Sequence, residues 1–290
     1  MTTADPHRAI DAVWRIESAR LVAGLARIVG DVGLAEELAQ DALVAALEQW
    51  PEAGVPRNPG AWLMAIGKRR AVDHVRRRQR LERKLDELGR HLPEAEDPAD
   101  LDIPGGDIQD DLLRLVFTAC HPVLSPEARV ALTLRVLGGL TTGEIARAYL
   151  VPETTIAQRI VRAKRSLVQA GVRFEVPEGT ERVERLASVL EVIYLVFNEG
   201  YSATAGDDWM RPALCEEAQR LGRTLAELMP DEAEVHGLVA LLEIQASRAA
   251  ARTGPAGEPV LLLDQDRRRW NQLLIRRGLA ALARAEALEA

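Results

Sequence analysis

The stretch TTGEIARAYLVPETTIAQRIVRAKRSLV, residues 141–168, has the pattern of two helices joined by a short turn. Thr141, followed three residues later by Glu144, is a capping box that begins the first helix. Pro152 lies near the start of the second helix, which is basic. The apolar residues of the second helix expected to point inward are Ile156, Ile160 and Leu167. The stretch therefore predicts a helix-turn-helix.

The second of these helices carries the side chains that could contact DNA. The residues expected to share its outward face are Thr155, Gln158, Arg159 and Arg162. Guanidinium groups reach guanine O6 and N7 or phosphates, and a carboxamide can read adenine. A solvated basic face on a helical bundle is the alternative. We predict that these four residues bind DNA.

Charge is unevenly distributed along the 290 residues, although the net charge is −7. Residues 62–84 contain nine Lys and Arg against two acids, and residues 152–173 contain five bases against one acid. Between them, residues 85–111 contain ten acids against one base. Because salt screens charges beyond roughly 8 Å, local basic stripes govern the attraction to phosphates. Two basic helices separated by an acidic connector suggest a protein that holds two separate DNA elements.

The composition favours an all-α protein of two or three domains, since Ala, Leu, Arg and Glu dominate and aromatics are only 4%. No apolar run approaches the length of a membrane span, and the N-terminus shows no export signal. The two cysteines, Cys120 and Cys215, offer no disulfide framework. We expect a cytoplasmic protein that binds no membrane.

Breaks in the pattern divide the chain into four parts: 7–84, the polar connector 85–108, 109–174 and 175–290. In the part 109–174, which contains the helix-turn-helix, Ser125 before Pro126 is a good helix N-cap. The last part contains an apolar helix, LASVLEVIYLVFNEGYSA, expected to end at residues 198–200. Amphipathic helices at 212–229, 231–250 and 264–288 should follow it. The apolar residues from Leu186 to Phe197 must bury against later helices, the preceding domains or another chain.

Three segments resemble the extracytoplasmic-function sigma factors, bacterial transcription initiation factors with a region 2, a linker and a region 4. GDVGLAEELAQDALVAALEQW resembles the region 2 helix that contacts the polymerase clamp helices, and NPGAWLMAIGKRRAVDHVRRR the part that melts and reads the −10 element. The helix-turn-helix at 141–168 resembles the region 4 reader of the −35 element. The resemblance implies two partners, promoter DNA and core RNA polymerase through its clamp helices and flap.

Within the region 2 segments, the resemblance assigns roles to two sets of residues. The basic helix would contact DNA through Lys68, Arg69, Arg70, Arg76 and Arg77, which can neutralise phosphates. The preceding helix would bind polymerase through Glu37, Leu38, Gln40 and Asp41, an apolar contact flanked by acceptors. A helix packed only within its own bundle is the alternative for the second set. Trp62 could either stack on an unpaired base or belong to the core.

The chain departs from the family in two places and continues past region 4. Arg69 stands where asparagine is frequent, and Leu150 stands in the turn where glycine is usual, so this turn could have another geometry. The part at 175–290 resembles the C-terminal extension of one sigma subgroup, which normally leads into tetratricopeptide-like helical pairs. Such an extension is a candidate regulator that contacts the sigma domains or another protein. Its array is either short here or truncated.

The sequence carries no pattern of an enzyme. It has no GxxxxGKS phosphate loop, no HExxH and no paired CxxC motif. Cys120-His121 is better explained by a half-buried thiol than by a zinc site. We therefore predict a non-enzymatic protein with no metal or other cofactor. A helical scaffold, or a non-sigma helix-turn-helix regulator whose C-terminal part docks proteins, is the alternative function.

Overall fold

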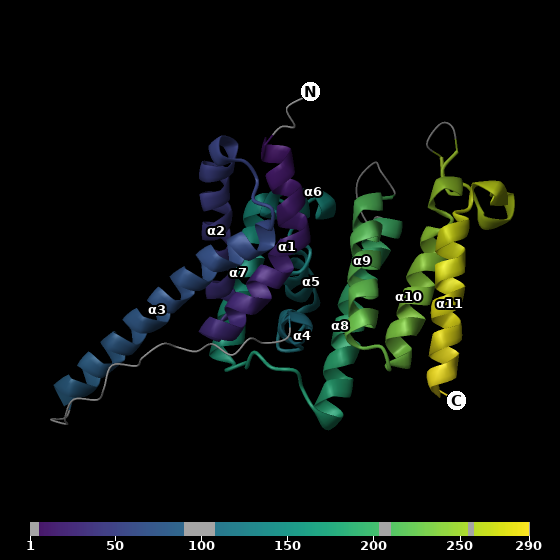
Figure 1. The fold of residues 1–290 in the computed structure, drawn as a ribbon. Coiled ribbons are helices and arrows are strands. Elements are labelled where there is room, and N and C mark those ends of the chain that lie inside the picture. The colour runs from purple at the N-terminus through teal and green to yellow at the C-terminus, as the bar shows by residue number, and fades with distance from the viewer. Residues whose placement is uncertain (1–5, 90–107, 203–209, 255–257, 290) are drawn as a thin grey trace. The chain divides into compact units, whose positions relative to one another are not determined.

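The computed structural model describes residues 6–89, 108–202, 210–254 and 258–289. Side chains of 81–89 are not described. Its elements are α1 (Pro6–Val29), α2 (Val32–Ala53), α3 (Pro59–Gly89), α4 (Ile108–Ala119), α5 (Pro126–Val136), α6 (Thr142–Tyr149), α7 (Glu153–Gln169), α8 (Gly179–Tyr201), α9 (Pro212–Leu228), α10 (Ala233–Ala246) and α11 (Gln272–Glu289). Three short 3-10 turns lie between α10 and α11. The protein is all-α, which confirms the predicted fold class (Figure 1).

The chain forms two compact units, the first of which contains residues 1–118 and 167–176. Helices α1, α2 and α3 pack on one another in this unit. Small residues allow the close approach, because a Cβ at Gly67 of α3 would lie only 2.9 Å from Leu25 of α1. Asp31 caps α2 by accepting a hydrogen bond from the backbone N–H of Leu34 at 3.0 Å. The result is a small helical bundle around the apolar faces of α1, α2 and α3.

Helix α4 is tied to α1 within the same unit by an ion pair. Asp111 is buried and lies 2.8 Å from the guanidinium of Arg27 and 2.7 Å from that of Arg114. Helix α3 continues to Gly89, past the expected start of the connector at residue 85, and residues 90–107 of the connector lie outside the described residues. The contact to Arg27 therefore joins segments on either side of the connector.

The second unit contains residues 119–166 and 177–290, so α5 and α6 group with α8–α11. Ser125 caps α5 ahead of Pro126, and Thr141 and Glu144 form the capping box of α6. Both caps were predicted from the sequence and are confirmed. They fix where α5 and α6 begin, because each cap satisfies backbone N–H groups that have no partner within the helix.

Leu150 ends α6 in the left-handed conformation, with φ 50° and ψ 42°. Among the described residues it has the only positive φ of a residue other than glycine. The turn thus keeps the geometry that glycine adopts freely, and the expectation of another geometry is wrong. A left-handed residue with a Cβ is strained, and the Leu150 side chain, 54% exposed, recovers little by burial.

Replacing Leu150 by glycine should therefore stabilise the second unit, by about 1 kcal/mol. The reason is relief of the Cβ contact that disfavours the left-handed conformation. Chemical denaturation of the full chain measures the effect, and Leu150→Ala serves as the control because alanine keeps the Cβ. Equal stability of the glycine and alanine variants would show that the turn is not strained.

The remaining helices of the second unit, α8 to α11, pack in succession, each on the next (Figure 1). Most of the apolar residues predicted to bury between Leu186 and Phe197 do so, whereas Tyr194 is exposed and Leu190 and Leu195 are half-buried. The buried ones are Leu186, Val189, Val192, Ile193, Val196 and Phe197. Two expected helix boundaries differ from the structure. Helix α8 ends at Tyr201, just past the expected 198–200, and the last helix begins at Gln272 rather than 264. Gly200 lies inside α8, where a Cβ would come within 2.7 Å of the Cys215 backbone nitrogen. Close packing of α8 on α9, rather than helix termination, explains this glycine.

Helices α8 and α9 also contact α5 and the residues next to its ends through polar groups. Arg129 of α5 is buried, donates to the hydroxyl of Ser188 and lies 2.9 Å from the carboxylate of Glu191. The Ser188 hydroxyl donates in turn to the carbonyl of Cys120 at 2.7 Å. From α9, Arg220 donates to the carbonyl of Leu137 at 2.6 Å. Helix α5 and the C-terminal helices are therefore packed on one another within the second unit.

Candidate nucleic-acid interface

Helix α7 buries one side and exposes the opposite one. The inward residues are those predicted, Ile156, Ile160 and Leu167, together with Ala163. With 3.6 residues per turn, this buried stripe directs another set of residues to solvent: Thr154, Ala157, Gln158, Val161, Arg162, Arg165 and Val168. Gln158 and Arg162 of the predicted DNA-binding set are exposed, whereas Thr155 and Arg159 are half-buried on the flank of the helix.

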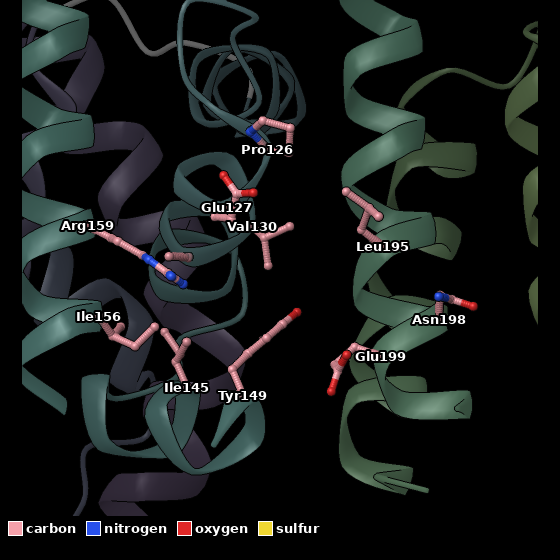
Figure 2. Close-up of a pocket in the computed structure, with 11 residues that line it drawn as sticks. Pro126, Glu127, Val130, Ile145, Tyr149, Ile156, Arg159, Leu195, Asn198 and Glu199 are labelled. Carbon is pink, nitrogen blue, oxygen red and sulfur yellow. The ribbon is translucent and has the colours of Figure 1, made fainter. Parts of the chain in front are cut away.

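Arg159 points away from the outward face and lines a cavity of about 250 Å³ between the helix-turn-helix and α8 (Figure 2). The expectation that it faces outward is corrected by its place on α7, one residue beyond the exposed Gln158. Glu127 of α5 lines the same cavity. Hydrogen bonds from its own backbone N–H and from Ser125 lower the pKa of Glu127, and the charge of Arg159 lowers it further. The carboxylate therefore stays ionised near the Arg159 guanidinium.

The opposite wall of this cavity contains Glu199 of α8, which pairs with Arg211. Tyr149, the last residue of α6, also lines this cavity. Its hydroxyl is buried and has no hydrogen-bond partner among the described residues. Burial raises the pKa of Tyr149, and the negative charge of Glu199 raises it further. The tyrosine is therefore a neutral hydrogen-bond donor inside the cavity, beside a carboxylate that Arg211 holds.

The basic residues of α3 lie on exposed positions, as a phosphate-binding helix requires. Lys68, Arg69, Arg70, Arg76 and Arg77 are all exposed. One of them is already engaged, since Arg70 lies 2.8 Å from Asp41 of α2, with both side chains about half exposed. This pair joins a predicted DNA contact to a predicted polymerase contact on neighbouring helices. An exposed pair of this kind contributes little stability, so either partner can be released by a competing charge.

Trp62 lies near the start of α3 and is half-buried. Its ring meets that of Trp50 edge to face, with the ring centroids 5.3 Å apart. Trp50 is buried in the bundle and so holds the Trp62 ring in place, while part of that ring stays at the surface. Trp62 therefore packs on the core of the bundle, and its stacking on an unpaired base stays a prediction for the part of the ring at the surface.

The outward face of α2 differs from the one predicted. Leu38 is buried, because it lies on the same side of the helix as Ala35, Ala42 and Ala45, and it cannot be the apolar contact of a partner. Glu37 and Asp41 are exposed and Gln40 is half-buried. The exposed apolar residues of this face are Val44 and Leu47, 50% and 37% exposed, which the sequence analysis missed. Val44 follows Asp41 by three residues and Glu37 by seven, the spacing of one helix face.

The two cysteines of the chain are buried thiols. Cys120 is fully rather than half-buried; burial raises its pKa to about 11, and burial raises that of Cys215 to about 12. Within the described ranges, no three His, Cys, Asp or Glu side chains gather as metal ligands would. In the same part of the chain, none of the helices has the length and apolar character of a membrane span.

Comparison with known families divides the chain into three matched segments. Residues 16–81 match Sigma-70 region 2, and residues 114–167 match Sigma-70, region 4. Residues 185–286 match a family of unknown function (DUF6596). The two basic helices, α3 and α7, thus lie in the region 2 and region 4 matches, and α8–α11 lie largely in the third.

Several curated proteins are similar to the chain. An uncharacterised protein of Rhizobium meliloti is 45% identical over 263 residues; these are 90% of this chain but only 62% of that protein's length. A probable ECF RNA polymerase sigma factor, SigI of Mycobacterium tuberculosis, is 28% identical over 76% of this chain and 77% of its own. The ECF RNA polymerase sigma factor SigK of Mycobacterium bovis is 32% identical over 49% of this chain and 74% of its own length. No solved structure gave a match.

These matches bear on the two functions that the sequence left open. Both sigma regions occur in order, and SigK reaches its identity over about three quarters of its length. A scaffold or a non-sigma regulator is therefore not favoured. The chain belongs to the extracytoplasmic-function (ECF) family of RNA polymerase sigma factors.

Proposed function

We propose that the chain binds core RNA polymerase in the cytoplasm and directs it to promoters by recognising a −10 and a −35 element. The observation that carries the proposal is the presence of two exposed basic helices: α3 lies in the first compact unit, and α7 lies in the second one except for its last three residues. Each lies within the sigma region to which DNA recognition belongs. Such an arrangement suits binding to two short DNA elements, each held by its own domain.

In region 2, α3 would hold the melted −10 strand. Lys68, Arg69, Arg70, Arg76 and Arg77 would neutralise phosphates, and the surface part of Trp62 would stack on or wall a pocket for an unpaired base. The Asp41 side chain would leave Arg70 when α2 docks on polymerase, so binding of polymerase would free one more cation for DNA. Polymerase contact itself would use Glu37, Gln40 and Asp41 around the apolar Val44 and Leu47.

In region 4, α7 would enter the major groove of the −35 duplex. Gln158 and Arg162 are exposed and suited to base edges or phosphates. Thr155, half-buried on the flank, would contact the backbone at the edge of the groove. Arg159, which lines the cavity beside Glu127, would contribute less to DNA binding. The helices of the extension, docked on α5 through Arg129, would act as a regulatory part of region 4.

The proposal is tested by mixing purified full chain with core polymerase and measuring co-elution and promoter-dependent transcription. Transcription that depends on the chain is expected, and core enzyme alone should give none. A chain that elutes apart from core polymerase and leaves its activity unchanged would refute the proposed function.

Arg162→Ala should weaken binding to the −35 element by about 1–3 kcal/mol if the guanidinium reads a base, and by less if it contacts only phosphate. Arg159→Ala should cost less than Arg162→Ala, because Arg159 faces the cavity beside Glu127. Fluorescence anisotropy of the polymerase-bound factor on −35 DNA measures both. A larger loss for Arg159 than for Arg162 would contradict the observed orientation of α7.

A further inference from the structure

The outward face of α7 has an apolar residue among its polar ones. Val161 is 53% exposed, although an apolar side chain on a solvated helix face contributes no favourable burial. Gln158 precedes it by three residues and Arg165 follows by four, so the three side chains are neighbours along the helix surface. Ala157, also exposed, lies one turn before Val161. An apolar spot of two side chains therefore lies between an amide and a guanidinium.

The orientation of Arg159 makes this apolar spot more significant. Arg159 turns toward the cavity beside Glu127 (Figure 2), and Val161, two residues further along, remains 53% exposed. The buried residues Ile156, Ile160 and Ala163 fix this rotation of the helix, because they form the core of the helix-turn-helix. A DNA duplex that meets α7 on its exposed face thus meets Val161.

The major groove offers one apolar group to such a side chain. Each base pair presents hydrogen-bond donors and acceptors there, and only thymine adds a methyl group, at C5. An aliphatic side chain on a reading helix gains from burying that methyl group and loses against a polar base edge in the same place. Resting on the proposed function, we propose that Val161, aided by Ala157, packs against the 5-methyl group of a thymine in the −35 element and is a specificity-determining residue.

The position of Val161 along α7 suits this role. Recognition helices contact base edges with their N-terminal residues; Ala157 lies in the N-terminal half of α7 (Glu153–Gln169), and Val161, at the midpoint, lies one turn beyond it. Val168 is 60% exposed but lies seven residues further on, about 10 Å along the helix axis. Val168 is therefore a matched control: the same residue type, on the same helix, with similar exposure, beyond the reach of the same base pair.

The experiment uses holoenzyme reconstituted from the full chain and core polymerase. Selection from promoters randomised around the −35 position first yields the preferred element. Each thymine of that element is then replaced in turn by uracil, which removes the 5-methyl group and leaves base pairing intact. Affinity for each duplex is measured with the wild type, Val161→Ala and Val168→Ala.

We expect one thymine at which uracil lowers the affinity of wild-type holoenzyme about fourfold, the equivalent of roughly 0.8 kcal/mol for one buried methyl group. Val161→Ala should bind the thymine duplex about as weakly as the wild type binds the uracil duplex, and should not distinguish the two. Val168→Ala should behave as the wild type. Because Val161 is exposed and alanine favours helix, the variant is expected to fold, which its circular dichroism checks.

Two results would overturn the inference: a wild type that never distinguishes uracil from thymine, or a Val161→Ala variant that keeps the full discrimination. Either can occur while the holoenzyme still selects a −35 element, and the proposed function would then stand without this contact. Failure to select any element would instead count against the proposed function itself.

Discussion

Replacing Arg129 by alanine is expected to loosen the extension from region 4 and to lower the stability of the second unit by about 3 kcal/mol. Arg129 is buried and bonds two residues of α8, Ser188 and Glu191, and hydrogen bonds to charged groups contribute roughly 1.5–3 kcal/mol each. Without the guanidinium, α8 keeps only the bond from Ser188 to Cys120 at this point. Chemical denaturation measures the loss, and hydrogen exchange on α5 and α8 locates it.

The control for this change is Glu191→Gln, made on the other side of the same contact. Glu191 is 48% exposed, so its carboxylate is largely solvated and its removal should cost under about 1 kcal/mol. If the extension regulates region 4 through this contact, Arg129→Ala should also change promoter-directed transcription while Glu191→Gln changes it little. Equal stability losses for the two variants would mean that the buried guanidinium is not what holds the two parts together.

Reversing the charge of Asp41 and inserting a charge at Val44, as Asp41→Lys with Val44→Asp, should abolish association with core polymerase, a loss of about 100-fold or more. Like charges placed against a partner cost several kcal/mol, and a charge at Val44 removes an exposed apolar contact. Both residues are exposed on α2, so the bundle should stay folded. Co-elution with core polymerase measures the effect.

Two controls separate contact from stability here. Asp11→Lys reverses an exposed charge on α1 and should leave polymerase binding unchanged. Leu38→Ala creates a cavity in the bundle and should cost about 2–5 kcal/mol of stability. Its effect on polymerase binding should follow the fraction unfolded. Normal co-elution of the Asp41→Lys, Val44→Asp protein would place the polymerase-binding surface elsewhere.

Much of the fold follows from local sequence, because helix ends are set by neighbouring residues. Ser125, Thr141 and Glu144 predicted two helix starts that the structure confirms, and the apolar composition of α8 predicted that much of this helix is buried. The outward face of α7 was also accessible from the sequence. A strict count from Ile156, Ile160 and Ala163 places Val161 outside and Arg159 on the flank. The predicted outward face was wrong at Arg159 because the polar residues of the helix were assigned to one face without regard to their angular positions.

Other features depend on residues far apart in the chain and could not be predicted from local pattern. Arg129 meets Ser188 across 59 positions, and nothing in either segment alone indicates the contact. Gly200 was explained as a helix end, whereas its place is set by the backbone of Cys215 on α9. Leu38 had two possible roles until the packing of α1, α2 and α3 buried it. Tertiary contacts decide such cases because they override local preference.

Recognition of two DNA elements by two parts of this chain, on behalf of polymerase, is tested most directly by transcription from randomised templates. Core enzyme and purified full chain transcribe a library randomised over the promoter region, and the transcribed templates are sequenced. We expect enrichment of two short elements at a fixed separation, both lost when the chain is omitted. Enrichment of a single element, or of none, would contradict it.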